Sequence, residues 1–288
     1  MKNNLRQIIN ENLEKGTAVG HFNFSTFDVA QAIVNAAKNL NLPVILGLSE
    51  GERDFAGFQE AVAWVKAIRE NFYAPVFLNA DHTYSYERIV EAVEAGFDMV
   101  IYDDAAGDLD KNIEEAKKCR EFINNFNQKN GTDVLLEAEI GYIGKSSKIL
   151  DVLPDGLQMT SKVDALKFVS EVHPDLLAPA VGNVHGMLKG AVKDPDLDTN
   201  RVKEISETVK IPLVLHGASG NGKDEIQTSI KNGVAVVHVN TEIRVAYKNA
   251  LEKIALEKEV APYKYMKVVE EDVQKVVEEK LKTFNFIN

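Results

Sequence analysis

The chain has only one cysteine and no long apolar run. Cys119 is the single cysteine among 288 residues, so no disulfide can form within the chain and a zinc site built from several thiolates is excluded. Because Cys119 lies in a helix-like stretch, we interpret it as a core residue. No apolar run approaches the ~20 residues of a membrane span, and residues 1–14 lack the continuous apolar segment of a signal peptide. We therefore expect a cytoplasmic protein.

Basic residues are also fewer than acidic ones. The sequence has 33 Lys and Arg against 44 Asp and Glu, a formal net charge of −11. This excess of acid argues against nucleic acid or an anionic membrane as a partner. An anionic substrate would need local positive charge. The remaining composition, 45% hydrophobic and 27% charged, is typical of a globular protein with a sizeable core.

Short β-branched runs alternate with amphipathic stretches along the whole chain, which favours parallel βα units. The expected strands are 17–22, 43–47, 75–79, 99–102, 134–137, 176–180, 212–215 and 235–239. The expected helices between them are 27–39, 58–70, 86–95, 109–126, 163–171, 198–209 and 223–231. Eight such units predict an α/β fold of the (β/α)8 TIM-barrel type, in one domain over residues 1–288. An open doubly wound sheet is the alternative.

Two features depart from a minimal barrel. The connections 141–159 and 182–197 are long, which is typical of functional loops. Residues 260–288 add a charged, amphipathic C-terminal segment with a helix expected over 268–283. This segment either extends the barrel or forms a subunit contact.

The unusual polar residues fall where the expected strands end, which in a barrel is the catalytic rim. They are Asn23, Ser49, Glu50, Asp81, His82, Asp103, Glu139, His185, His216, His238, Asn240 and Thr241. They reach this rim from eight different strands, so their side chains can converge.

Three histidines, His82, His185 and His216, follow three different strands. Imidazole is a preferred zinc ligand, and catalytic zinc takes three protein ligands with an open fourth position. We therefore predict that these histidines bind a metal, with Glu139 as a nearby carboxylate ligand. His21 and His173 do not share that placement, and His173 is better explained as a helix cap.

Asp81 stands directly before His82 and can move a proton to or from a substrate hydroxyl. The alternative is that Asp81 caps the helix that starts near Ser85. Glu137 shares a strand face with Glu139, and an ionised carboxylate inside a barrel needs a partner.

Two turns are suited to an anion. The first is His216-Gly-Ala-Ser-Gly220, between a strand and a helix, and the second is Asn240-Thr241 at the next helix start. Barrel phosphate sites are commonly built after strands seven and eight. The segment Gly182-Asn-Val-His-Gly186 with Lys189 is a third candidate, although Lys189 is equally well explained as a solvated loop residue.

These segments together resemble the class II fructose-bisphosphate and tagatose-bisphosphate aldolase family over nearly the whole chain. The matching segments are Phe22-Asn-Phe24, Leu48-Ser-Glu-Gly51, Ala80-Asp-His82, Glu137-Ala-Glu-Ile-Gly141, Val181-Gly-Asn-Val-His-Gly186, Leu215-His-Gly-Ala-Ser-Gly220 and Val239-Asn-Thr-Glu242.

The resemblance implies a zinc aldolase of phosphorylated ketoses. His82, His185 and His216 would hold Zn2+, Asp81 would be the proton donor, and Glu139 with Asp103 would offer an alternate or second metal position. Dihydroxyacetone phosphate would be bound by Gly186, Gly217, Ala218, Ser219, Asn240 and Thr241, with Na+ or K+ nearby; Asn23, Ser49 and Lys189 are further substrate-binding candidates. Zinc would act as a Lewis acid on the ketose carbonyl, and the family forms homodimers or higher assemblies.

Two positions depart from the family pattern. His238 stands where the family has an asparagine that contacts the reacting sugar, and Gly144-Lys-Ser-Ser147 stands where the family has a loop with a glutamate that exchanges the C3 proton. Asp151 and Asp155 are hypothetical substitutes for that acid. From sequence alone, His238→Asn is expected to raise turnover.

Three functions remain open on these residues. Fructose 1,6-bisphosphate is the default substrate of a zinc aldolase, with tagatose 1,6-bisphosphate close behind. The second function is a phosphosugar-binding protein with low or altered activity. The third and least favoured is a metal-dependent epimerase or dehydratase on the same barrel.

Overall fold

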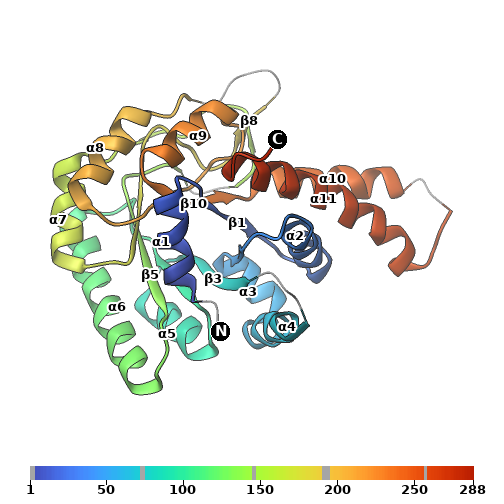
Figure 1. Cartoon of the computed structure of the whole chain (residues 1–288), viewed down its shortest axis with the longest axis horizontal. Helices are drawn as coiled ribbons and strands as arrows, with labels where there is room; N and C mark the ends of the chain where they lie inside the picture. The colour runs from blue at the N-terminus through green and yellow to red at the C-terminus, as the bar shows by residue number, and fades with distance from the viewer. Residues whose placement is uncertain (1–3, 72–74, 145–146, 190–194, 256–257) are drawn as a thin grey trace.

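Eight parallel strands close into a barrel, as the sequence predicts (Figure 1). The computed structural model describes residues 4–71, 75–144, 147–189, 195–255 and 258–288. The barrel strands are β1 (Val19–Asn23), β2 (Val44–Leu48), β3 (Val76–Thr83), β4 (Met99–Tyr102), β5 (Leu135–Ile140), β7 (Leu176–Pro179), β9 (Leu213–Leu215) and β10 (Val234–Val239). Each strand pairs with its neighbours in this order, and β10 closes the ring on β1.

Helices on the outside cover the strands. They are α2 (Phe27–Leu40), α4 (Phe58–Asn71), α5 (Tyr86–Ala95), α6 (Leu109–Asn130), α7 (Lys162–Val172), α8 (Thr199–Val209) and α9 (Lys223–Lys231), whereas α10 (Thr241–Ile254) follows the last strand and projects from the barrel (Figure 1). Helix α5 shows how the sequence sets the start, the buried face and the end of a helix. Ser85 Oγ accepts the Arg88 N–H at its start, Ile89 and Val93 are buried on its inner face, and Gly96 ends it in the left-handed conformation. Buried apolar side chains between this helical layer and the strands form the main core.

Helix α1 (Leu5–Lys15), which is not among the expected helices, lies across the barrel (Figure 1). Leu5 and Ile9 pack against a cluster of buried side chains from the starts of the strands, such as Val19 and Phe77. Asn4 caps the helix by accepting the Gln7 N–H. The helix therefore closes the end of the barrel opposite the catalytic rim.

Several element boundaries differ from those expected. Strands β3 and β5 run farther than 79 and 137, so Asp81, His82 and Glu139 lie within strands and not after them. A short helix α3 (Glu50–Ala56) follows β2. The two long connections carry β6 (Ile149–Leu150) and β8 (Met187–Leu188), which pair in parallel. Residues 190–194 lie outside the described part of the chain.

Helices α10 and α11 (Pro262–Phe284) project together from the barrel as a pair (Figure 1). Helix α11 starts six residues before the expected 268, because Pro262 is well placed in a first helical turn. Its second half buries Val273, Val277 and Leu281 in the core, beside α2. No helix in the described ranges combines the length and apolarity needed to cross a bilayer.

Candidate metal centre and active site

Four side chains at the rim offer one ligand atom each within 4.8 Å of one another. They are His82 on β3, Glu139 on β5, His185 after β7 and His216 after β9. The structure thus brings together the three histidines and the carboxylate that the sequence predicts as metal ligands. Three nitrogens and one carboxylate oxygen are a suitable donor set for zinc.

Each of these imidazoles has its second ring nitrogen engaged by an oxygen. The pairs are His82 Nδ1 with Asp103 Oδ2 at 2.8 Å, His185 Nδ1 with the Gly144 carbonyl at 2.7 Å, and His216 Nε2 with Glu137 Oε1 at 2.6 Å. Metal-binding histidines usually donate their other N–H to such an acceptor, which fixes the ring and its tautomer. Each ring has one further nitrogen. Those of His82 (Nε2) and His216 (Nδ1) are 3.3 Å apart. The residues therefore fit a metal ion.

Charge in the centre also fits a cation. Glu137 and Glu139 are buried, and burial raises the pKa of both well above the usual value. One oxygen of each, Oε2, has no hydrogen-bond partner. A bound cation would favour the ionised form of these carboxylates, which burial alone disfavours. Burial lowers the pKa of His185 to about 4, so this ring is neutral at physiological pH and can ligate a metal.

The backbone at His82 is strained. Its φ is 35°, which is rare for a residue with a side chain, and the β3–β4 register shifts between Ala80 and Thr83. The buried guanidinium of Arg53, on α3, donates to the carbonyl of Asp81 at 2.8 Å and to Thr83 Oγ1 at 3.1 Å. Arg53 therefore stabilises a bulge that re-aims His82 towards the other ligands.

Asp81 is held beside the metal-ligand group by Asn23, whose Nδ2 donates to Asp81 Oδ2 at 2.8 Å. The other oxygen, Oδ1, lies 3.7 Å from His82 Nε2 and has no hydrogen-bond partner. Burial, the largest single influence, would raise the pKa of Asp81, but the imidazoles of His82, His238 and His21 together outweigh it and the pKa is lowered. The capping role considered for Asp81 belongs to Ser85.

Three imidazoles form a stack on neighbouring strands. The His238 ring lies between His21, at a centroid distance of 3.5 Å, and His216, at 4.1 Å. His21 was not among the predicted site residues, because it lies within a strand and not after one. The signal that places it is register, since His21 pairs with His238 in the β1–β10 ladder.

The phosphate-binding candidates surround a cleft. Its wall is formed by Asn23, Asp81, His82, Ser147, His185, Gly186, His216, Gly217, Ser219, His238, Asn240 and Thr241. Gly217 has φ 58°, and a Cβ there would lie 2.2 Å from the Val184 carbonyl oxygen, so this turn requires glycine. Ala218 is buried behind the wall, and its N–H donates to the His238 carbonyl at 3.4 Å.

Other candidates lie elsewhere. Lys189 and Asp151 are 3.6 Å apart, with 74% and 84% of their side chains exposed, and Asp155 is also exposed. Ser49 caps α3 by pairing with Glu52 and does not line the cleft. Of the altered loop, Ser147 lines the cleft, whereas residues 145 and 146 lie outside the described part.

Arg244, on α10, is a basic residue at the mouth of the cleft, beside Ser147, and was not among the predicted site residues. It donates to Glu52 Oε1 at 2.6 Å and to the Ser147 carbonyl at 2.9 Å. The sequence does hold a sign of it: Arg244 lies in the first turn of the helix that begins after the candidate phosphate turn Asn240-Thr241. The cleft is narrow, with a volume of about 20 Å3.

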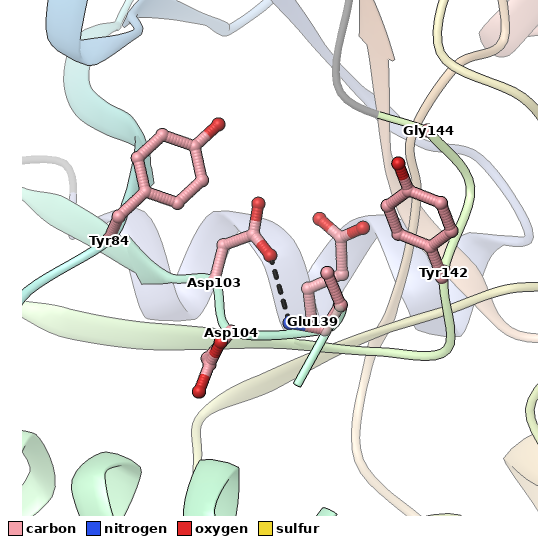
Figure 2. A pocket seen from close by; sticks show the side chains of 8 residues that line it. Tyr84, Asp103, Asp104, Glu139, Tyr142 and Gly144 are labelled. Atoms are coloured by element: carbon pink, nitrogen blue, oxygen red, sulfur yellow. Dashed lines mark hydrogen bonds between the residues drawn. The ribbon is translucent and has the colours of Figure 1, made fainter. Parts of the chain in front are cut away.

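A second, larger pocket of about 180 Å3 adjoins the metal-ligand group. Figure 2 shows the Asp103 and Glu139 carboxylates between the rings of Tyr84 and Tyr142, with Asp104 turned away from them. Asp103 Oδ1 also accepts the Ala105 N–H at 3.1 Å. Asp103 therefore contacts His82 at Nδ1, and it is not one of the four residues whose ligand atoms converge.

Comparison with known proteins shows the family of this chain. The family model described as "Fructose-bisphosphate aldolase class-II" matches residues 3–288. The chain is 34% identical to the fructose-bisphosphate aldolase of Staphylococcus aureus strain Mu50, over 99% of this chain and 97% of that protein. It is also 34% identical to the probable fructose-bisphosphate aldolase of Bacillus subtilis strain 168, over 99% and 98%.

Solved structures show the same fold. The YdjI aldolase from Escherichia coli K12 superimposes with a TM-score of 0.82 at 26% identity, covering 99% of this chain and 97% of that one. A putative fructose-1,6-bisphosphate aldolase from Coccidioides immitis has a TM-score of 0.83 at 24% identity, covering 98% and 96%, and supports the fold alone. The protein belongs to the class II fructose-bisphosphate aldolase family, and it is an aldolase, a lyase of carbohydrate metabolism.

Proposed function

We propose that this aldolase is zinc-dependent and reversibly cleaves a ketose 1,6-bisphosphate, by default fructose 1,6-bisphosphate, to dihydroxyacetone phosphate and an aldehyde. The carrying observation is the convergence of His82, His185 and His216, each with its second ring nitrogen engaged by an oxygen. A bound zinc ion would supply a Lewis acid for the ketose carbonyl at this position.

Asp81 is the proton-transfer group of the proposed reaction. Its Oδ1 is buried at the cleft without a hydrogen-bond partner, while Asn23 holds Oδ2. In cleavage, Asp81 Oδ1 takes the proton of the C4 hydroxyl while the C3–C4 bond breaks; the electron pair of that bond passes towards the C2 carbonyl and the C4 carbon leaves as the aldehyde. A lowered pKa keeps Asp81 ionised and able to accept this proton.

Backbone amides are the main candidates for the phosphate. Gly217, Ser219, Asn240 and Thr241 come together at the cleft, where α10 begins. The N–H groups of a helix start favour an anion. This arrangement supports binding of the dihydroxyacetone phosphate half, with Na+ or K+ as a further candidate ligand. Arg244 is the candidate for charge at the opposite side of the mouth.

A second function has a specific observation in its favour. Ser147 and His238 line the cleft at positions where an acid and an amide would complete proton handling. Low or altered activity on a phosphosugar is therefore the alternative, and tagatose 1,6-bisphosphate is the alternative substrate.

We also propose a homodimer or higher homo-oligomer in the cytoplasm. The support for assembly is the projecting α10–α11 pair (Figure 1), because Val260, just before α11, and Tyr263, on α11, are 86% and 79% exposed. Sedimentation or light scattering of wild type and Tyr263→Glu tests this, and a monomeric wild type would contradict it.

The function is tested by comparing cleavage of the two bisphosphates in wild type and Asp81→Asn. We expect wild type to release dihydroxyacetone phosphate from at least one of them, and Asp81→Asn to lose about 10²–10⁴-fold in kcat, the range for removal of a general acid–base group. The proposal fails if wild type cleaves neither sugar, or if Asp81→Asn cleaves as fast as wild type.

A further inference from the structure

His21 is fully buried on the inner face of β1, away from the four-residue metal group, and no step of the proposed reaction uses it. Its ring stacks on His238 with a centroid distance of 3.5 Å and an interplanar angle of 4°. On the opposite face of His238, His216 stacks at 4.1 Å and 21°. Both faces of the His238 ring are therefore covered, and only its edges can interact.

A metal site is not the explanation for this pair. His21, Asp81 and His238 bring ligand atoms within 4.8 Å of one another. An imidazole binds a metal in the plane of its ring, however, and the rings of His21 and His238 are stacked and nearly parallel. One ion cannot lie in both planes at the ~2.0–2.1 Å of a Zn–N bond. The two histidines are arranged to contact each other and not to share an ion.

Two residues on neighbouring strands make room for His21 and fix it. Gly47, on β2, lies between β1 and β3. A Cβ at Gly47 would lie 2.1 Å from Cε1 of His21, so no larger residue is compatible with this ring position. Across that gap, Asn79 Nδ2 on β3 lies 3.0 Å from His21 Nε2 and donates to it. This hydrogen bond holds the ring in place against β3.

The edges of His238 face the site. Its Nδ1 lies 3.5 Å from Asp81 Oδ1, the oxygen that has no hydrogen-bond partner, and its Nε2 lies 3.8 Å from Glu137 Oε2. A rotation of the ring about its long axis would remove Nδ1 from Asp81. The stack on His21 prevents this rotation, because a turned ring would collide with the imidazole beside it.

We propose that His21 is a positioning residue, which with Gly47 and Asn79 holds the His238 ring edge-on to Asp81 for the aldol reaction. This inference rests on the proposed function of Asp81. It also changes the expectation for His238→Asn. Asparagine cannot fill the space between two imidazoles, so we now expect this substitution to lower turnover on the natural substrate and not to raise it.

A double-mutant cycle tests the proposal in the full-length, zinc-loaded enzyme. We expect His21→Ala to lower kcat about tenfold with KM within about twofold, because a misplaced group costs rate more than binding. In a His238→Asn background the same change should alter kcat less than about twofold, since the ring that it positions is gone. Asn79→Ala is a second variant if His21→Ala does not fold, with the same pattern expected.

Phe22→Leu is the matched control. Phe22 is the next residue on β1, points to the opposite face and stacks on Phe284. Its effect on kcat should be the same factor in both backgrounds. Equal factors for His21→Ala in the two backgrounds would overturn the positioning role, and so would a fall in zinc affinity that accounts for its loss of rate.

A readout that needs neither zinc nor turnover separates this inference from the proposed function. Ring 15N NMR of the metal-free protein reports the tautomer of His238. We expect one tautomer in wild type and averaged ring shifts in His21→Ala, and unchanged shifts would overturn the proposal. If wild type cleaves neither bisphosphate while the shifts change as expected, the substrate assignment fails and the positioning of His238 by His21 stands.

Discussion

His82 Nδ1 lies 2.8 Å from Asp103 Oδ2. Asp103 directly follows β4, and its carboxylate orients His82, the proposed metal ligand on β3. The contact leaves His82 Nε2 to face the cleft. It also lowers the pKa of Asp103 against the effect of burial, which alone would raise it. Asp103 is therefore ionised and accepts the N–H of His82.

Removing Asp103 is expected to weaken metal binding. Loss of a carboxylate behind a ligating histidine typically costs 10–100-fold in metal affinity, so Asp103→Ala should raise the Kd for zinc by about that factor. Competition with a chromophoric chelator measures it. Asp104→Ala is the matched control, expected within about twofold of wild type, because Asp104 turns away from the ligands (Figure 2). Equal zinc affinity in Asp103→Ala and wild type would contradict the arrangement.

Arg244 is expected to contribute to substrate binding. It is a cation at the mouth with 44% of its side chain exposed, so Arg244→Ala should raise KM for a bisphosphate about tenfold with a smaller change in kcat. Lys248→Ala, four residues farther along α10 and 77% exposed, is the control and should leave KM unchanged. Steady-state kinetics on both variants decides, and an unaltered KM in Arg244→Ala would exclude the contact.

Arg53 is expected to stabilise the strained segment that contains Asp81 and His82. Its guanidinium is fully buried and donates to the Leu48 and Asp81 carbonyls, and burial lowers its pKa to about 10. Arg53→Leu leaves these carbonyls without a donor, and we expect a loss on the order of 3 kcal/mol in the free energy of unfolding. Urea denaturation measures it. A loss below about 0.5 kcal/mol, typical of a surface change, would show that the bulge does not depend on Arg53.

Cys119 is expected to be unreactive in the folded protein. It is fully buried, and burial raises the pKa of its thiol to about 12. At pH 8 roughly one thiol in 10⁴ would be ionised, and only the thiolate reacts. Mass spectrometry after iodoacetamide treatment should show labelling only when the protein is unfolded. Rapid labelling of the native protein would contradict its place in the core.

The barrel and most of the site follow from sequence because both depend on local patterns. Strand runs alternate with helical periodicity, and a chemically unusual residue at a strand end is visible without coordinates. His82, His185 and His216 were found this way, and the structure brings them together. Cys119 as a core residue and His173 as a helix cap are also confirmed.

What the sequence did not reveal depends on contacts between distant strands. His21 lies inside β1, and only the register with β10 places it on His238. Arg53 looks like an ordinary charged helical residue, yet it is buried beneath β3. Helix α1 was not among the expected helices, although Leu5, Ile8, Ile9 and Leu13 stand at helical spacing and pack on the buried cluster at the starts of the strands.

The central claim is that the histidine cluster holds the metal on which cleavage depends. Its most direct test follows zinc content and bisphosphate cleavage in one sample, through removal by a chelator and stepwise return of zinc. We expect cleavage to fall with the bound metal and to return in proportion to it, reaching a plateau near one zinc per chain, with no return in His216→Ala. Full cleavage by metal-free protein would contradict the account.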